Sequence, residues 1–436
     1  MSELLREMSN TALRLGIPLG VQLDLTYRCN ERCVHCYLDH SDHGEMNTAE
    51  ITDLLDQMAT AGVFFLTLSG GEILMRRDFL EIFEYARRLM FCVKLKTNAV
   101  MIHEAEADRI QALAPESVQI SVYSHRPEVH DAITKLPGSL KKSLAGATLL
   151  VERGVKVFFA NVLMRDNFQD YSGVQALAAE VGAKYTVDPT ITPMMDGDRS
   201  ILNLNIERAE LEQVFRDASL LGTSVEEFCA PPAGPLTQED AMETLPCSAS
   251  HTFCYVSPYG DVYPCVQFPL PTGNVRTTRF IDIWKHSPQM NEVRSITMND
   301  LPVCSTCSHG GGSCTRCPGL AYMEGNMRGP SSQDCEKSYA RTGMVTAGML
   351  AHHTAKANAG LVQIKGSTEQ HYRPQGQVEL NPERNAEPLG GIAHPPQQLA
   401  HDVCSIGTFE TFRMPWEASP PTSSSASQKA TAGSTS

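Results

Sequence analysis

Three cysteines lie within the stretch CNERCVHC near the start of the chain. Cys29, Cys33 and Cys36 have the spacing C-x3-C-x2-C. Structural zinc sites are closed by four ligands, so three thiolates leave a zinc ion one ligand short unless His35 supplies the fourth. In an iron–sulfur cluster, a missing ligand leaves one iron free to bind a substrate or cofactor. The spacing therefore favours a cluster and keeps zinc as the alternative.

The other cysteines are also grouped. The chain has 436 residues and 14 cysteines, and eight of them lie between Cys247 and Cys335. Two C-x2-C pairs in CSTCSHGGGSCTRC would by themselves indicate zinc, but eight thiolates could also complete two four-thiolate clusters. The eight are Cys247, Cys254, Cys265, Cys304, Cys307, Cys314, Cys317 and Cys335. We read Cys92 as a small core residue, Cys229 and Cys404 as free thiols, and His352–His353 as no site.

Composition limits the possible partners and the location. The net charge is −14 and no long Lys/Arg run occurs, which disfavours nucleic acid as a partner. The first residues carry charges and lack a secretory apolar core, and no apolar run is long enough to span a membrane. We therefore expect a cytoplasmic protein whose grouped cysteines bind metal and do not form disulfides.

The elements that would position these cysteines alternate between strands and helices. Asn47 as N-cap and Glu50 three residues on predict a helix start, and another helix follows Asp78. Six strands, each followed by a helix, indicate a parallel sheet, either doubly wound or a complete or partial barrel. The predicted strands are 21–27, 63–68, 91–97, 117–123, 155–163 and 183–191, and further helices are predicted near 104–113, 139–153, 168–181 and 207–219.

Polar residues gather where these strands end, which is the edge at which α/β proteins bind ligands. The cysteines follow the first strand, and Ser69, Gly70, Gly71 and Glu72 follow the second. Glycines there would let the backbone approach a ligand, and the carboxylate could bind an ammonium group. Later strand ends add candidate ligand contacts at Thr97, Asn98, Ser121, Tyr123 and Asn161, and candidate proton acceptors at Asp24, Tyr27 and Asp188.

With CNERCVHC followed by GGE one strand later, residues 18–225 resemble the radical S-adenosylmethionine (SAM) superfamily. The resemblance implies a partial (βα)6 barrel. It also implies a [4Fe–4S] cluster on Cys29, Cys33 and Cys36 whose open iron chelates SAM, with GGE at the amino group of SAM. His35 departs from the family, which usually has an aromatic residue at that position.

The later cysteines are similar to the SPASM extension of radical SAM enzymes, although Cys314 comes one residue late. The resemblance implies one or two auxiliary iron–sulfur clusters. Its pairing would place Cys247, Cys254, Cys265 and Cys317 on one cluster and Cys304, Cys307, Cys314 and Cys335 on the other. Cys254 is the least certain ligand, because the first cluster could keep an open iron.

The resulting interpretation is an α/β radical SAM oxidoreductase that cleaves SAM reductively and oxidises a peptide or protein side chain. A low-potential donor such as flavodoxin or ferredoxin would supply the electron. The alternatives are an enzyme acting on a tetrapyrrole or other small molecule and, more remotely, a zinc-stabilised scaffold without catalysis. We expect an N-terminal segment (1–17), a barrel (18–225), a linker (226–245), a loop-rich, cysteine-rich auxiliary-cluster module with little regular structure (246–340), a possible helix (341–364) and a low-complexity, disordered tail (365–436).

Overall fold

The computed structural model describes residues 3–40 and 43–352 of the chain. A single sheet runs through the molecule in the order β6-β5-β4-β3-β2-β1-β7-β8-β9. The first six strands are parallel and adjacent in chain order, so the winding is that of a barrel and not of a doubly wound sheet. They are β1 (Gly20–Thr26), β2 (Phe65–Gly70), β3 (Cys92–Thr97), β4 (Ser117–Ser121), β5 (Val157–Val162) and β6 (Lys184–Asp188).

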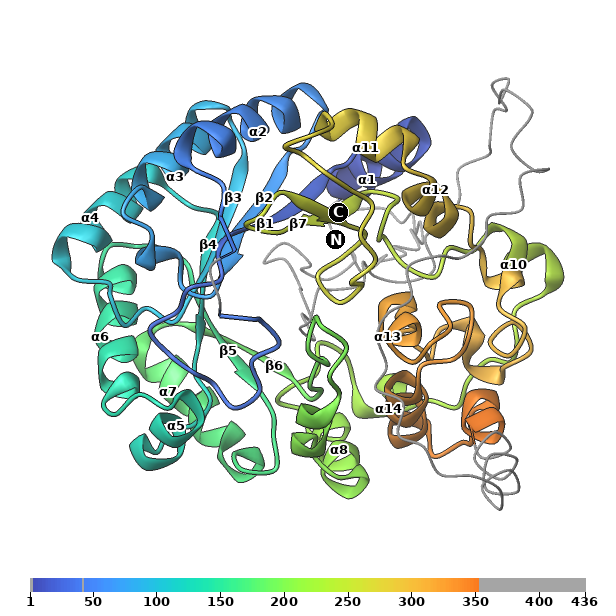
Figure 1. Cartoon of the computed structure of the whole chain (residues 1–436). Helices are drawn as coiled ribbons and strands as arrows, with labels where there is room; N and C mark the ends of the chain where they lie inside the picture. The colour runs from blue at the N-terminus through green and yellow to red at the C-terminus, as the bar shows by residue number, and fades with distance from the viewer. Residues whose placement is uncertain (1–2, 41–42, 353–436) are drawn as a thin grey trace, which may run out of the picture.

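Helices cover the outer face of this curved sheet, as Figure 1 shows. The predicted start of α2 is confirmed, because Asn47 and Glu50 form a capping box and the apolar stripe of the helix is buried. These helices are α2 (Thr48–Thr60), α3 (Phe79–Arg88), α4 (Glu104–Leu113), α5 (Pro127–Thr134), α6 (Ser139–Glu152) and α7 (Tyr171–Val181), with 3-10 turns at Ile73–Met75 and Phe168–Asp170. The predicted fold class, a partial parallel barrel, is therefore confirmed.

Two helices of this half were not predicted. Helix α1 (Glu3–Leu15) precedes the first strand. Helix α5 begins with a proline at its first turn and supports the cysteine loop, by which we mean residues 27–40. The backbone N–H groups of Arg32 and Val34 donate to the carbonyls of Thr134 and Ile133 at 2.9 and 3.0 Å. The end of α5 therefore fixes the height of the loop above the sheet.

The cysteine-rich module, residues 246–340, is joined to the barrel through the sheet itself. We expected little regular structure here, yet β7 (Phe253–Val256) pairs with β1 in parallel, with Tyr255 opposite Gln22. Strands β8 (Asp261–Tyr263) and β9 (Gly273–Asn274) continue the sheet antiparallel. The module also contains α11 (Phe280–His286), α12 (Pro288–Arg294), α13 (Pro318–Met323), α14 (Ser332–Thr342) and 3-10 turns at Met298–Asp300 and Ser308–Gly311.

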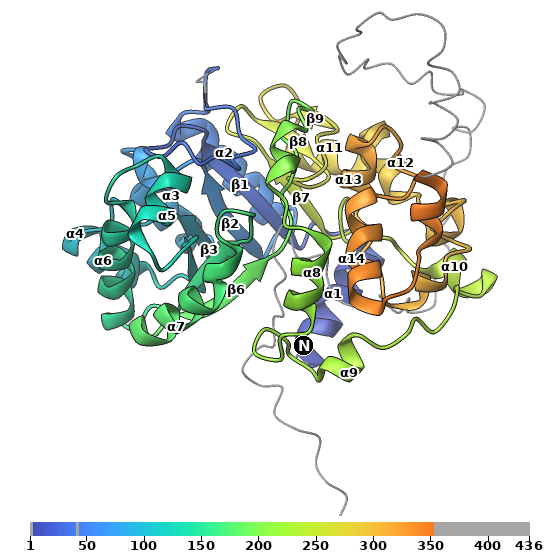
Figure 2. The same cartoon turned by 90° about the horizontal axis from the view of Figure 1, so that it is seen from below.

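A second contact between barrel and module is made by α8 (Arg208–Phe215), which follows β6 and lies beside α14 in Figure 2. The guanidinium of Arg208 pairs with Glu336 and lies 4.5 Å from the ring centre of Tyr339. Arg216 donates to the carbonyl oxygen of Ala340 at 3.1 Å. The module is thus held at both β1 and α8.

The remaining predicted segments are partly described. The 3-10 turn Ser200–Leu204 precedes α8, and the expected linker (226–245) begins within α9 (Val225–Phe228) and contains α10 (Gln238–Glu243). Residues 347–352 are helical, within the range predicted as a possible helix. The predicted tail, His353 and Cys404 lie outside the described residues. Within 3–40 and 43–352, no helix is long and apolar enough to cross a membrane.

Candidate active site

The cysteine loop leaves the end of β1 and carries three half-buried thiols. Cys29, Cys33 and Cys36 are close enough for the charge on one to oppose ionisation of the others. Burial is the larger effect, and it raises the pKa of Cys29 to about 12 and the pKa values of Cys33 and Cys36 above the ordinary thiol range. A cationic centre would be required to hold all three as thiolates.

Two of the three sulfur atoms receive the hydrogen bonds that a metal thiolate needs, while the Cys33 thiol donates to Glu31 Oε2 at 3.5 Å. The N–H of Glu31 donates to Cys29 Sγ at 3.4 Å, and the N–H of Leu38 donates to Cys36. Asn98, at the end of β3, places its amide nitrogen 3.9 Å from Cys29 Sγ and donates to Asn30 at 2.7 Å. Hydrogen bonds to sulfur stabilise cluster thiolates and tune their potential, so the loop fits an iron–sulfur group.

The zinc alternative is not supported by this geometry. Within the part of the chain that the structure describes, no three Cys, His, Asp or Glu side chains converge to hold one metal ion. His35, the possible fourth zinc ligand, instead packs edge-on against Tyr123 with the ring centres 4.7 Å apart. A cluster does not need convergence on one point, because each thiolate binds a different iron.

The two glycines of GGE lie against the backbone of the cysteine loop. A Cβ on Gly70 would lie 2.2 Å from the carbonyl oxygen of Thr26, and one on Gly71 would lie 2.4 Å from that of Arg28. The N–H of Gly71 donates to Thr26 at 2.8 Å, and that of Glu72 donates to Arg28 at 3.0 Å. The glycines are therefore required for β2 to support the loop, whatever ligand they also approach.

The carboxylate of Glu72 is fully buried and bonded within the protein. It accepts from the Thr97 hydroxyl and the Asn98 N–H, both at 2.7 Å, and from the Leu74 N–H at 3.0 Å. Burial still raises its pKa above the ordinary range. Glu72 thus ties the end of β2 to the end of β3, and its contact with a ligand ammonium stays a prediction.

The module brings three of its cysteines around one small cavity of about 20 Å³. Cys247, Cys265 and Cys317 line it. Each receives a backbone N–H: Ala249 donates to Cys247 and Leu320 to Cys317 at 3.4 and 3.5 Å, and Gln267 donates to Cys265. A backbone N–H thus donates to each of these three sulfurs, as it does to Cys29 and Cys36 of the cysteine loop.

A second group contains Cys304, Cys307, Cys314 and Cys335. The charge of Cys335 acts on Cys314, and the charges of Cys304 and Cys307 act on Cys335, so the four lie together. Cys307 Sγ accepts from the N–H of Ala347 at 3.4 Å. The structure therefore separates the module cysteines into two groups drawn from distant parts of the chain.

Comparison with known proteins agrees with these sites. The family model described as the radical SAM superfamily matches residues 23–174, and the model of the SPASM iron–sulfur cluster-binding domain matches residues 247–308. The PqqA peptide cyclase of Xanthomonas campestris pv. campestris is 31% identical over 342 residues, covering 75% of this chain and 89% of that protein. This chain belongs to the radical SAM superfamily.

Other relatives of this radical SAM protein divide between two named activities. The mycofactocin maturase MftC of Mycobacterium tuberculosis is 29% identical over 68% of this chain and 77% of that protein. The AdoMet-dependent heme synthase of Methanosarcina barkeri is 26% identical over 64% of this chain and 85% of that protein. The solved structure of Streptococcus suis SuiB with the precursor peptide SuiA has a TM-score of 0.59 at 16% identity, covering 76% and 79%, and shows the shared fold.

A radical SAM protein with a SPASM domain uses a [4Fe–4S] cluster, SAM and auxiliary iron–sulfur clusters. The two cysteine-bearing regions described above fit these groups by their donor chemistry. Cys254 is the exception. It lies on β7 with no exposed surface and packs in the barrel core, and within residues 3–40 and 43–352 no backbone N–H donates to its sulfur, although the charge of Cys265 acts on it.

Of the other residues predicted to contact SAM, Ser69 and Ser121 lie at strand ends but are bonded to Asp24 and Tyr123. Asn161 shares its face of β5 with Val157 and Phe159, which pack under the helices. It donates to the Tyr185 hydroxyl at 3.2 Å. The structure therefore does not bring Asn161 to the ligand-facing side with the others.

The remaining candidate residues contact residues outside the three cysteine groups. Cys92 is half-buried on β3, and Cys229 donates its thiol hydrogen to the Phe215 carbonyl at 3.3 Å. His352 lies 3.8 Å from Glu324. Asp188, the candidate proton acceptor at the end of β6, accepts from the N–H and the hydroxyl of Thr190 at 3.0 and 2.8 Å.

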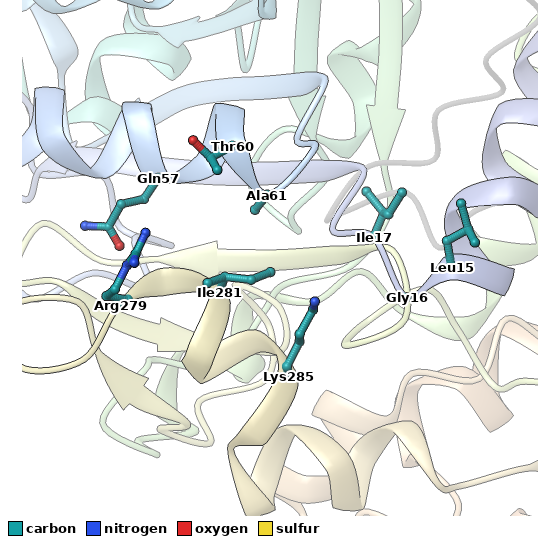
Figure 3. Close-up of a pocket in the computed structure, with 9 residues that line it drawn as sticks. All are labelled: Leu15, Gly16, Ile17, Gln57, Thr60, Ala61, Arg279, Ile281 and Lys285. Carbon is teal, nitrogen blue, oxygen red and sulfur yellow. The ribbon is translucent and has the colours of Figure 1, made fainter. Parts of the chain in front are cut away.

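A different cavity, of about 160 Å³, lies away from the cysteines at the amino ends of the strands. Figure 3 shows its wall, formed by the residues before β1, the end of α2 and helix α11. The lining residues are Leu15, Gly16, Ile17, Gln57, Thr60, Ala61, Arg279, Ile281 and Lys285. Its position excludes it from the site at the carboxyl ends of the strands.

Proposed function

We propose that this radical SAM enzyme oxidatively modifies a side chain of a peptide or protein, by crosslinking or dehydrogenation. The observation that carries the proposal is that Tyr37 lies near cysteines of both the cysteine loop and the module. The charges of Cys36 on the cysteine loop and of Cys265 in the module both act on its hydroxyl. A substrate held near Tyr37 would have both groups within reach, which suits an oxidation that removes hydrogen and then an electron.

In this proposal, Cys29, Cys33 and Cys36 hold the SAM-binding cluster and the two module groups hold the auxiliary clusters. When bound, SAM and its cluster supply a 5′-deoxyadenosyl radical that takes a hydrogen atom from an unactivated carbon. The chain's own part is to fix the loop through Gly71 and Glu72 and to exclude water. Buried aromatic residues such as Tyr27 and Tyr255 support that exclusion.

A peptide substrate is supported by the PqqA peptide cyclase relative, of which this chain covers 89%. The heme synthase relatives support the second candidate, an enzyme acting on a tetrapyrrole. The two cysteine groups in the module, of three and four thiols, support an oxidation, because the oxidised substrate loses an electron that an auxiliary cluster could accept. We expect a low-potential donor of the flavodoxin or ferredoxin type to supply the electron that starts turnover.

The test is anaerobic reconstitution followed by turnover with SAM and dithionite. The probe substrates are short peptides encoded beside the gene, the PqqA and SuiA precursor peptides, and a propionate-bearing tetrapyrrole. We expect 5′-deoxyadenosine together with a peptide that has lost hydrogen, measured by mass spectrometry. Consumption of the tetrapyrrole with every peptide unchanged would favour the second candidate. A colourless protein that binds only zinc and releases no 5′-deoxyadenosine would support the scaffold.

A further inference from the structure

Three side chains form a buried hydrogen-bonded chain where the module strand β7 meets the barrel strand β1. The Tyr255 hydroxyl donates to Asp24 Oδ2 at 3.0 Å. The Tyr27 and Tyr255 hydroxyl oxygens are 2.6 Å apart. Asp24 and Tyr255 have no exposed surface, and Tyr27 is 6% exposed. The chain crosses from the end of β1, beside the cysteine loop, to the module and back to β1.

The hydrogen bonds among Tyr27, Tyr255 and Asp24 all run in one direction, from donor to acceptor, toward Asp24. A tyrosine hydroxyl has one hydrogen, and Tyr255 gives its hydrogen to Asp24. The short contact between the two hydroxyls therefore requires Tyr27 to donate to Tyr255. The order is Tyr27 to Tyr255 to Asp24, which is the arrangement needed to deliver a proton to the carboxylate. The Tyr27 hydroxyl oxygen also lies 3.5 Å from Met195 Sδ, which is a weak hydrogen-bond acceptor.

The surroundings of Asp24 raise its pKa toward neutral pH. Burial raises the pKa of Asp24 to about 6, while hydrogen bonds from Gln22, Tyr255 and Ser69 lower it. The positive charge that faces it is Lys96 on β3. The titratable groups on which its charge acts are Tyr27, Tyr37, Tyr255 and Cys36. At neutral pH Asp24 is ionised and ready to accept a proton.

We propose that Asp24 is the proton acceptor of the oxidation and that the hydroxyls of Tyr27 and Tyr255 carry the proton to it. This assignment rests on the proposed function. It also gives the module a role in the barrel's own chemistry, because Tyr255 belongs to the cysteine-rich module and completes the path from Tyr27, at the start of the cysteine loop, to Asp24 on β1.

In this proposal each hydrogen and each electron that leaves the substrate has an acceptor. An oxidation that forms a crosslink or a double bond removes two hydrogens from the substrate. One leaves as a hydrogen atom and becomes part of the methyl group of 5′-deoxyadenosine. The other leaves as a proton and an electron, the electron passing to a one-electron acceptor of the iron–sulfur class. The proton passes to Tyr27 as Tyr27 gives its own to Tyr255, and Tyr255 gives its own to Asp24, so neither tyrosine gains charge.

The experiments must distinguish proton transfer from a purely structural role of the hydrogen bonds among Tyr27, Tyr255 and Asp24. A second tyrosine–aspartate pair in the protein provides the control. Tyr85 donates to Asp56 at 2.8 and 2.9 Å on the protein surface, with no link to the cysteine loop. Substitutions there remove the same groups without touching the buried path. Tyr255→Phe removes a single oxygen from the path and keeps the ring, so it tests the proposal even if Asp24→Asn fails to fold.

The first measurement is infrared spectroscopy of the full, reconstituted chain as a function of pH. The difference spectrum, wild type minus Asp24→Asn, is expected to show a carboxyl band that appears below a midpoint of about pH 6. The bands of Asp188 and Glu31 occur in both proteins and cancel in the difference. Tyr255→Phe is expected to move that midpoint upward, because the lost hydrogen bond favoured the ionised form. Asp56→Asn is expected to leave the band in place. A band without a midpoint between pH 5 and 8 overturns the assignment.

The second measurement is product formed per 5′-deoxyadenosine with the peptide that the wild-type chain converts. In the wild type this ratio is expected to fall as the pH falls through the infrared midpoint, because a protonated Asp24 accepts nothing further. Asp24→Asn and Tyr255→Phe are each expected to lower it at least tenfold at pH 7, whereas Tyr85→Phe keeps the wild-type ratio. Equal ratios in the wild type, Asp24→Asn and Tyr255→Phe would overturn the proton-transfer assignment and leave the proposed function standing. A wild type that makes no peptide product overturns the proposed function and the assignment with it.

Discussion

The barrel and the cysteine-rich module hold their cysteines in opposite ways. The barrel carries Cys29, Cys33 and Cys36 on one short loop, supported from below by the glycines at the end of β2 and from the side by α5. The module draws its first group from positions far apart, such as Cys247 and Cys317, and joins Cys335 to the nearby Cys304, Cys307 and Cys314 in its second. Its helices α11 to α13 have only six or seven residues each.

The difference shows which part of the molecule folds before its metal. The barrel strands and helices share one continuous apolar core, in which Leu23, Ile51, Phe83 and Phe159 are fully buried. Among the described residues, the second module group lies beside two small cores, one around Leu301 and one that Ala340 of α14 shares with α8. Short elements without a large core are usually stabilised by the metal they bind. We therefore expect the barrel, with the module elements that share its core, to tolerate loss of iron, and the part of the module around the second cysteine group to lose its order.

The largest expected effect is on catalysis and comes from the barrel loop. Replacing Cys29, Cys33 and Cys36 together with alanine should abolish 5′-deoxyadenosine formation from SAM and dithionite under anoxia, because SAM then has no iron to bind. Circular dichroism should stay close to the wild type, since the loop does not form the core. Undiminished cleavage would contradict the role of the loop, and a collapsed spectrum would contradict an independently folded barrel.

Removing iron from the whole protein separates the two regions directly. After chelation, hydrogen exchange measured by mass spectrometry should rise strongly in peptides covering residues 300–340 and change little in β2 to β5. The physical reason is that the second cysteine group lacks an apolar core large enough to replace its metal. Equal exchange in the two regions before and after chelation would remove the distinction between them.

A smaller effect is expected where β2 touches the loop. Gly71→Ala places a Cβ 2.4 Å from the Arg28 carbonyl, so the loop must shift; a cost of about 1–3 kcal/mol in unfolding free energy is typical of such overpacking. The loop's cluster should be lost more readily than those of the module, which electron paramagnetic resonance can distinguish. Gly310→Ala is the control, because its Cβ would meet the nearest atom at 3.5 Å. Equal losses in both variants would contradict the steric account.

The barrel was largely predictable from local patterns, whereas the joint between barrel and module was not. Alternating apolar runs located all six barrel strands, and Asn47 with Glu50 marked the start of α2. Strand β7 was missed because FCYV is four residues long, and its partner on β1 lies more than 200 residues away in the sequence. No local pattern records such a pairing, so Tyr255 could not be recognised as a neighbour of Asp24.

The site shows the same limit at the scale of single residues. Placing Asn161 near a strand end was correct, but its side of the strand was not considered. Val157 and Phe159 share its two-residue period and are apolar, which already indicated the face under the helices. The grouping of Cys304 with Cys335, in contrast, was predicted through the resemblance of the cysteine pattern to the SPASM extension, because the packing of α14 against the module cannot be derived from spacing alone.

The smallest expected effect concerns Cys254 and sharpens the comparison most. Although it lies in the cysteine-rich module, its side chain packs in the barrel core on β7, like a barrel residue. Cys254→Ala should therefore keep the wild-type iron content and auxiliary-cluster spectrum, and cost about 1 kcal/mol for the small cavity it leaves. Cys265→Ala, a change of the same size at a thiol that lines the cavity with Cys247 and Cys317, should lose the iron of that cluster. Equal iron loss in the two variants would make Cys254 a ligand. The first auxiliary cluster would then reach through the sheet into the barrel core, and the boundary between the two regions would disappear.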